Sequence, residues 1–285
     1  MNHIKTLFLM TLLTVLLVLA GGAIAGEAGL IFALVFAVLL NVFTWWNSDR
    51  IAIRMTRSQP LPRSRAPRLY EMVERLCARA KLPMPRLYLT PSQQPNAFAT
   101  GRSPRHSAVA VTEGLLRQLD AEEIEGVIAH ELAHIRNRDT LISTVAAVMA
   151  GALTAVARIG TYGMLLGGGR GRGGNPVTIL LAIILAPIAA MLIRMAVSRS
   201  REFAADRSAA AIAGSPTGLV SALRKLDRTA RTSRMQVSEA ASHMFIVNPL
   251  SGGGMSALFS THPPMERRIE RLQRLQAPGA RRKLR

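Results

Sequence analysis

The sequence is poor in cysteine and in aromatic residues. Cys77 is the only cysteine among 285 residues, which excludes a disulfide-stapled secreted domain and fits a reducing compartment. Aromatic residues make up 5% of the chain, and several of them lie in apolar runs. Nucleic-acid surfaces interleave basic with aromatic side chains, so we expect no nucleic-acid partner.

Acidic residues are also scarce: 17 Asp and Glu stand against 36 Lys and Arg, which leaves a formal net charge of +19. Hydrophobic residues nevertheless make up 49% of the chain, and its mean hydropathy is +0.23. Aliphatic residues are too plentiful for a disordered or collagen-like chain. Charge and hydrophobicity must therefore lie in different parts of the sequence.

Two long apolar runs lie near the N-terminus, at residues 4–25 and 28–46. At ~1.5 Å per residue, each run is long enough to cross the ~30 Å hydrocarbon core of a membrane. A cleaved signal peptide would begin in a similar way, but the second run follows almost at once, with Glu27 between the two. Trp45 and Trp46 close the second run, where aromatic rings prefer the membrane interface. The pattern favours a retained membrane hairpin.

Basic residues cluster on one side of these spans. The loop between the spans has no Lys or Arg, whereas five arginines follow the second span: Arg50, Arg54, Arg57, Arg63 and Arg65. By the positive-inside rule, the N-terminus and everything after Trp46 face the cytoplasm. Together with Arg68 and the basic C-terminal tail, these arginines predict attraction to anionic phospholipid, at ~1 kcal/mol per charge near the surface.

Two further apolar runs, 141–166 and 176–197, flank a glycine-rich linker. Each run is long enough to cross a membrane, although each carries an arginine, Arg158 or Arg194, whose charge costs a few kcal/mol at bilayer depth. We expect a second membrane hairpin here, with two buried soluble helices as the alternative.

These runs divide the chain into four parts: an N-terminal hairpin at 1–46, a cytoplasmic part at 47–140, the second hairpin at 141–198 and a cytoplasmic part at 199–285. Neither cytoplasmic part is large. We therefore expect the two to fold together into one domain that the second hairpin interrupts.

Residues 119–139 carry the pattern of a single helix that begins at a capping box. Asp120 is the predicted N-cap, and Glu123 follows three residues later. Behind them, apolar residues recur at helical spacing and give the helix a buried face: Ile124, Val127, Ile128, Leu132 and Ile135.

The same helix contains an HExxH motif, which is the strongest chemical signal in the sequence. His130 and His134 lie one turn apart on one face, so both rings can reach one metal ion. Glu131 lies beside them, where a carboxylate can take a proton from metal-bound water. The alternative, a surface helix with two solvated histidines, does not account for the residues that follow.

A zinc hydrolase site needs a third protein ligand on a neighbouring element, with a fourth position left open. Glu202 and Asp206 lie one turn apart in an alanine-rich segment that is predicted to be helical, directly after the fourth apolar run. Glu202 can bind zinc, while Asp206 accepts the ring N–H of a ligand histidine and fixes its tautomer. The alternative is a pair of surface acids near Arg201 and Arg207.

HELAH at 130–134, EFAAD at 202–206 and the four apolar runs resemble the HtpX family of bacterial membrane zinc metalloproteases, relatives of the CAAX prenyl endopeptidases and the Oma1-type proteases. NAFATG at 96–101 and STHPP at 260–264 match the family as well. The resemblance covers essentially the whole chain. It implies a mainly α membrane protein, with a gluzincin-type zinc peptidase domain, a small β-sheet and about four transmembrane helices in two hairpins.

The resemblance also implies roles for single residues. One zinc ion (Zn2+) per chain would be bound by His130, His134 and Glu202. Glu131 would be the general base, and Asp206 would be the partner of His130. Family members degrade damaged or misassembled membrane proteins from the cytoplasmic side, without ATP. The expected protein is a multi-pass protease of the bacterial inner membrane that serves quality control and the stress response, with membrane proteins or unfolded polypeptides as substrates.

Two short strands are predicted at 86–89 and 107–111, and NAFATG lies between them with turn chemistry at both ends. An extended substrate can add to an exposed strand edge by backbone hydrogen bonds, so Asn96, Ala97 and Phe98 are candidate substrate contacts. An ordinary structural sheet is the alternative.

His262 is a second candidate catalytic residue. It lies on a rigid loop between Thr and Pro, from which it could donate to the oxyanion, a contribution of about 2–4 kcal/mol in other hydrolases. A histidine that only caps or packs is equally consistent with the sequence. His3, His106 and His243 stand alone without metal-ligand spacing, and we expect no site role for them.

The leading interpretation is a membrane-anchored zinc endopeptidase, and three alternatives stay open. An intramembrane protease would carry HExxH inside an apolar span, whereas acidic and arginine-containing stretches flank the motif here. A scaffold with a structural zinc site has no use for Glu131. A prenyl-protein endopeptidase would need a larger membrane chamber than four spans can build. Cys77 is expected to be a buried core thiol.

Overall fold

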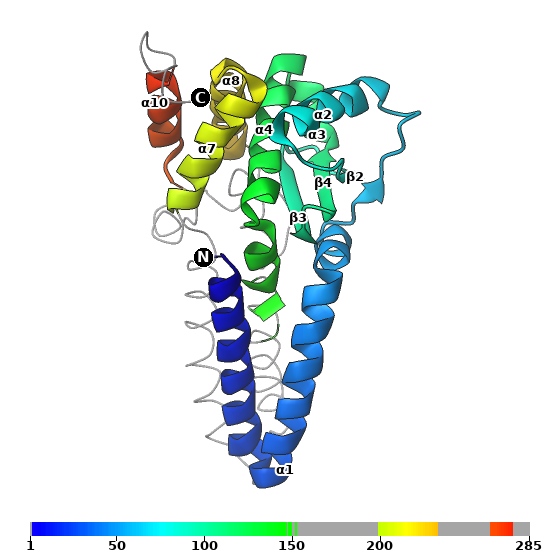
Figure 1. Ribbon diagram of the computed structural model, residues 1–285, viewed down its shortest axis with the longest axis vertical. Coiled ribbons are helices and arrows are strands. Elements are labelled where there is room, and N and C mark those ends of the chain that lie inside the picture. The colour runs from blue at the N-terminus through cyan, green and yellow to red at the C-terminus, as the bar shows by residue number, and fades with distance from the viewer. Residues whose placement is uncertain (1, 147, 150–151, 153–198, 233–262, 276–285) are drawn as a thin grey trace. The chain divides into compact units, whose positions relative to one another are not determined.

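The computed structural model describes residues 2–146, 148–149, 152, 199–232 and 263–275 (Figure 1). The described residues are mostly helical, with a small sheet. The chain divides into two compact units: residues 1–47 with 145–196, and residues 48–144 with 197–285. The predicted second hairpin lies largely outside the described residues, as does the basic C-terminal tail.

The first unit contains a helical hairpin within α1 (Asn2–Met55). The backbone leaves helical values at Ala25 and Gly26, and Gly26 has φ +61°, which glycine adopts without strain. A methyl group on Gly21 would collide with Ala33, so small residues let the two arms pack closely. Two stretches are apolar and long enough to cross a membrane, Thr6–Ala23 and Ala25–Met55. They match the two predicted N-terminal spans.

The two arms of the hairpin share a polar contact and present an apolar surface. Asn41 donates from Nδ2 to the Met10 carbonyl (3.2 Å) and to Thr14 Oγ1 (2.9 Å), which fixes one arm against the other. Large apolar side chains point outward along both arms, among them Leu7, Leu19, Ile31, Phe32, Leu39 and Trp46. Such a surface fits lipid rather than water.

The second unit contains a four-stranded mixed sheet. Its strands are β1 (Gln59–Pro60), β2 (Arg86–Thr90), β3 (Ala97–Ser103) and β4 (His106–Thr112). Their order is β1-β2-β4-β3. Strands β2 and β4 are parallel, whereas the other two pairs are antiparallel. The strands predicted at 86–89 and 107–111 are thus confirmed by β2 and β4.

The segment between the two predicted strands is itself largely a strand, β3, at one edge of this sheet. Ala97 to Thr100 pair in register with Val111 to Ala108 of β4, and Gly101, with φ +127°, lies at a bulge. The hairpin turn comes later, between β3 and β4. Sequence reasoning did not separate this strand from its ends, because Asn96 and Gly101 are both typical of turns.

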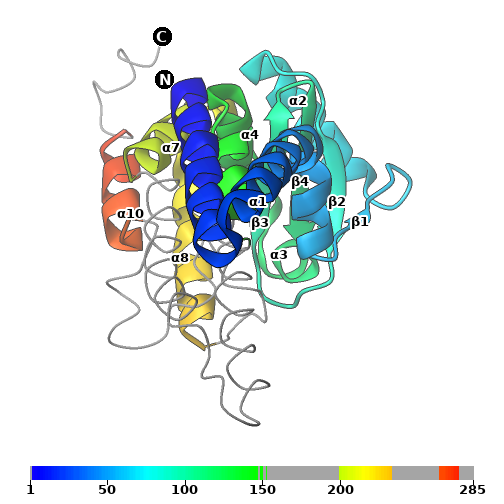
Figure 2. The same cartoon turned by 90° about the horizontal axis from the view of Figure 1, so that it is seen from below.

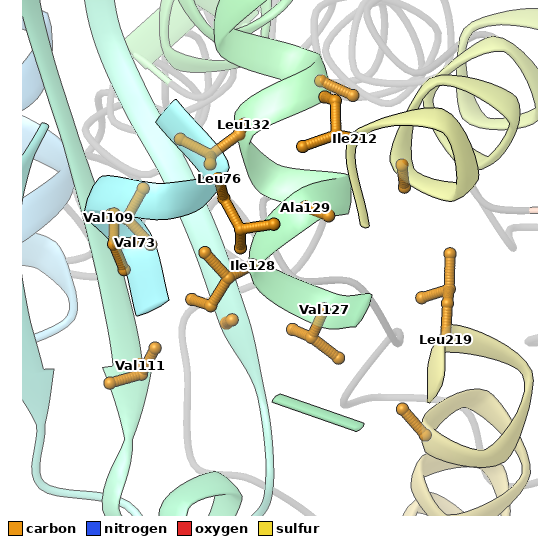
Figure 3. Packing of buried hydrophobic residues seen from close by; sticks show 14 of the residues in the cluster. Val73, Leu76, Val109, Val111, Val127, Ile128, Ala129, Leu132, Ile212 and Leu219 are labelled. Atoms are coloured by element: carbon orange, nitrogen blue, oxygen red, sulfur yellow. The ribbon is translucent and has the colours of Figure 1, made fainter. Parts of the chain in front are cut away.

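The described part of the second unit also contains these helices: α2 (Pro67–Ala80), α3 (Glu113–Gln118), α4 (Ala121–Asn137), α7 (Arg199–Ala213), α8 (Thr217–Thr232) and α10 (Met265–Arg274). Helix α4 is central, because it contacts β3 and α2 on one side and α7 and α8 on the other (Figure 2). Val109 of the sheet, Ile128 of α4 and Ile212 of α7 belong to one buried cluster (Figure 3).

The predicted capping box is present at the start of α4. Asp120 Oδ1 accepts from the Glu123 N–H, and Glu123 Oε2 accepts from the Asp120 N–H, both at 3.0 Å. Glu123 is 1% exposed and also accepts from Ser221 Oγ and Lys225 Nζ of α8, both at 2.6 Å. One buried carboxylate therefore starts α4 and joins it to α8.

We expect Glu123→Gln to lower the free energy of unfolding by about 1–3 kcal/mol, because an amide N–H₂ would replace a buried acceptor that several donors need. Denaturation of the detergent-purified chain measures this loss. The matched control is Glu125→Gln on the same helix, whose ion pairs with Arg75 and Arg79 are long, at 3.8 and 3.5 Å. That control should cost less than about 1 kcal/mol. Equal losses in the two variants would contradict a special role for Glu123.

Candidate metal centre

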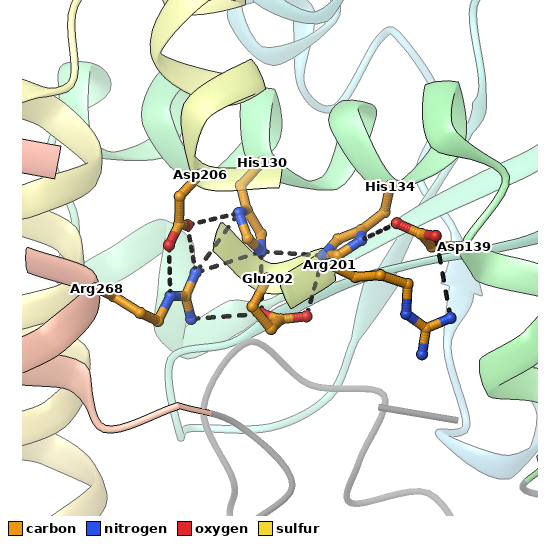
Figure 4. A network of polar contacts seen from close by, with 7 residues as sticks. All are labelled: His130, His134, Asp139, Arg201, Glu202, Asp206 and Arg268. Carbon is orange, nitrogen blue, oxygen red and sulfur yellow. Dashed lines mark hydrogen bonds and ion pairs between the residues drawn. The ribbon is translucent and has the colours of Figure 1, made fainter. Parts of the chain in front are cut away.

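Two neighbouring helices carry the candidate site (Figure 4). Helix α4 supplies His130, Glu131 and His134, and α7 supplies Glu202 and Asp206. The helical repeat places each pair of residues four apart on one face, as predicted. The alternatives of solvated histidines and surface acids are wrong, because four of these residues are buried and His134 is largely covered.

The donor atoms of three residues converge on one point. His130 Nε2 lies 3.1 Å from His134 Nε2, and Glu202 Oε2 and Oε1 lie 3.7 and 3.5 Å from these two nitrogens. In a tetrahedral zinc site with bonds of ~2.0–2.2 Å, donor atoms are separated by about 3.3–3.6 Å. The spacing in this structure therefore fits one zinc ion bound by His130, His134 and Glu202.

The outer nitrogens of both rings face aspartates. His130 Nδ1 is 3.0 Å from Asp206 Oδ1, and His134 Nδ1 is 3.2 Å from Asp139 Oδ2. Because a carboxylate only accepts, each Nδ1 carries the hydrogen, and the two Nε2 lone pairs then face each other beside Glu202. Such a cluster of acceptors is suited to bind a cation. The predicted pairing of Asp206 with His130 is present in the structure.

The pKa values follow from the same contacts. Burial alone would lower the pKa of His130, but its hydrogen bonds with Asp206 and Glu202 outweigh burial and raise the pKa to about 9. For Asp206, burial would raise the pKa, yet Arg268 and His130 lower it below its ordinary value. The site therefore attracts a cation at this position, either a proton or a metal ion.

Glu131 lies beside the two histidines but points to a different partner. Its pKa is raised by burial, which outweighs the lowering effect of His130 and His134. The backbone N–H of Ala99, in the edge strand β3, donates to its carboxylate. A buried carboxylate with a raised pKa holds a proton more tightly than an exposed one, which suits a group that accepts and returns a proton.

Sequence reasoning missed three charged residues of the site. Asp139 follows the left-handed C-cap of α4, Arg201 Nη1 lies 4.0 Å from Asp139 Oδ1, and Arg268 of α10 pairs with Asp206. One signal was available for Arg268. Met265, Arg268 and Leu272 recur at helical spacing and form the buried face of α10, so an arginine occupies a core position.

Two predicted features do not take part in the described site. Asn96, Ala97 and Phe98 are buried, at 0, 0 and 1% exposure. Their role in substrate binding stays a prediction. His262 lies outside the described residues.

The comparisons with known proteins agree with this geometry. The model of "Peptidase family M48" matches residues 63–276. The chain is 54% identical to a "Protease HtpX homolog" of Pelotomaculum thermopropionicum, over 95% of this chain and 98% of the relative. A homologue of the same name from Burkholderia thailandensis is 49% identical, over 98% of both chains.

A crystal structure of S. mikatae Ste24p shares the fold, with a TM-score of 0.53 and 19% sequence identity. The match covers 95% of this chain but 65% of that one, so this chain spans about two thirds of the length of Ste24p.

We expect the purified chain to retain about one zinc ion and His134→Ala to lose it, because the substitution removes one of three ligands. His134 is the most exposed of the three, so its removal disturbs packing least. Elemental analysis after gel filtration measures the bound metal. His106→Ala is the control, because His106 is exposed on β4 and hydrogen bonds with Ser103. Full zinc content in His134→Ala would exclude this ligand set.

Proposed function

Because the chain belongs to peptidase family M48 and is therefore a metalloprotease, we propose that it is a membrane-anchored zinc endopeptidase of membrane-protein quality control. It would cleave misfolded or damaged membrane proteins and unfolded polypeptides at the cytoplasmic face of the bacterial inner membrane. The observation that carries this proposal is the convergence of His130, His134 and Glu202 beside the buried Glu131.

When bound, zinc supplies a Lewis acid that polarises the scissile carbonyl and activates water. Glu131 would accept the proton of the attacking water at its carboxylate and return it to the nitrogen of the departing amine. Peptide hydrolysis is favourable in itself, and none of these steps consumes ATP.

The edge strand β3 supports a way of presenting substrate to this base. The Ala99 N–H already donates to Glu131, so the backbone of β3 runs beside the reacting position. An extended chain that adds to this edge would be bound through its backbone, with little dependence on side chains. That mode of binding suits a protease whose substrates share an unfolded state rather than a sequence.

Two other functions fit the structure less well. A scaffold with a structural metal site gives no reason for a buried acid next to the ligands, with a pKa that burial raises. An intramembrane protease would carry its HExxH motif in a span. Here α4 begins with Glu122 and Glu123 and lies outside both candidate spans of the described chain.

We expect Glu131→Gln to retain about one zinc ion and to cleave an unfolded model protein at least 10²-fold more slowly, because the base is lost while the ligands stay. Both proteins would be purified under chelation, to limit self-cleavage, before zinc is added. Glu125→Gln on the same helix is the control and should cleave at the parent rate. Equal cleavage by parent and Glu131→Gln would point to a contaminating protease and remove the support for Glu131.

Membrane orientation can be tested because Cys77 is the only cysteine. It is 4% exposed, and burial together with Glu74 raises its pKa to about 11, so it should not react with maleimide. In spheroplasts, a membrane-impermeant maleimide should label Glu27→Cys, in the exposed hairpin turn, but not Arg105→Cys, in the exposed turn between β3 and β4. Detergent should make Arg105→Cys reactive. Labelling of Arg105→Cys in intact spheroplasts would reverse the proposed orientation.

A further inference from the structure

Arg268 is an arginine with no solvent exposure, on the C-terminal helix α10. A guanidinium is always charged and is rarely buried completely unless acids surround it. Removing a charge from water costs several kcal/mol, and a bare contact with neutral groups does not offset that cost. The position of this side chain therefore requires specific partners.

Among the described residues, Arg268 has partners in the candidate metal centre (Figure 4). Its Nε and Nη2 donate to the two oxygens of Asp206, at 2.9 and 2.7 Å. Nη2 also lies 3.4–3.5 Å from the ring nitrogens of His130, and Nη1 lies 3.7 Å from Glu202 Oε2. Arg268 thus contacts one predicted metal ligand on α4, one on α7, and Asp206.

The fork of two hydrogen bonds fixes the plane of the Asp206 carboxylate. Oδ1 then has one orientation from which it accepts the His130 Nδ1–H, so His130 keeps its Nε2 directed at the point where the donors converge. Arg268 also balances the charge of Asp206. Glu202 and Glu131 remain as the acids next to a divalent ion.

We propose that Arg268 is a positioning residue of the metal centre, which acts through Asp206 on His130 and makes docking of α10 part of site assembly. The proposal rests on the metal centre of the proposed function. It also predicts reciprocity. If α10 completes the site, bound zinc must in turn stabilise the docked α10, because linkage between two equilibria works in both directions.

The test is zinc affinity, measured by competition with a chromophoric chelator on the full chain in detergent. All proteins carry Glu131→Gln, so that self-cleavage does not interfere. Arg268→Lys keeps the charge but cannot form the two-bond fork, and we expect about ten-fold weaker zinc binding. Arg267→Lys, at the adjacent exposed position, should leave affinity unchanged within two-fold.

A double-mutant cycle separates positioning from a general effect on folding. In an Asp206→Asn background, Arg268→Lys should cause little further loss of affinity, because the residue through which it acts has already been changed. Equal losses with and without Asp206 would overturn the proposal, and so would parent-like affinity in Arg268→Lys. If the parent itself binds no zinc, it is the proposed function that fails.

Hydrogen exchange supplies a second measurement that does not depend on Arg268→Lys being as stable as the parent. Zinc should slow amide exchange in α10 of the parent, and this zinc-dependent protection should disappear in Arg268→Gln. A residue that only supports packing would change exchange in α10 equally with and without zinc. That result would overturn the proposed coupling.

Discussion

The close contact between α4 and α7 is the constraint on which the metal centre depends. Histidines one turn apart on α4 are useful only if the acids of α7 come within about 4 Å of their rings. Short side chains make that approach possible: Ala129 and Ala133 of α4 and Ala205 and Ala209 of α7 are all essentially unexposed. Larger residues at such positions would separate the helix axes. The alanine-rich composition of α7 is thus part of the site rather than a neutral helix-forming choice.

Such packing buries charge, and the site has to neutralise it. Burial opposes the ionised state of Asp206, and its pairing with Arg268 and His130 overcomes that effect. His134 has a similar arrangement with Asp139, but the nearby Arg201 contacts that aspartate at 4.0 Å. The two candidate ligand histidines are therefore held unequally. His130 is buried and contacts Asp206, which Arg268 holds with two hydrogen bonds, whereas His134 lies closer to solvent and has the looser support.

The sequence predicted what local spacing determines. A repeat of 3.6 residues places His130 and His134 on one face of a helix, and it does the same for Glu202 and Asp206. The capping box at Asp120 likewise depends only on residues three apart. Contacts between segments far apart in the sequence could not be predicted in the same way. Arg268 meets Asp206 across 62 residues of sequence, and no local pattern states which acid a buried arginine will pair with.

Strand β3 was not predicted from the sequence, for a different reason. Its turn-forming end residues and small side chains carry little strand signal, and its pairing with β4 decides its conformation. The second hairpin and His262 concern residues outside those that the structure describes, so these predictions stand as they were drawn from the sequence.

The contacts of β3 also limit where a substrate strand could be added. The Gly101 carbonyl accepts from Thr140 Oγ1 at 2.8 Å, and the Thr100 hydroxyl contacts the Ser48 carbonyl and Thr144. The C-terminal half of the edge is therefore already engaged by the protein. Under the proposed function, backbone pairing would have to occur N-terminal to Gly101, where Ala99 is partly exposed while Asn96, Ala97 and Phe98 are buried. Since the Ala99 N–H is bonded to Glu131, strand β3 restrains the group that, under the proposed function, would receive the proton of the attacking water.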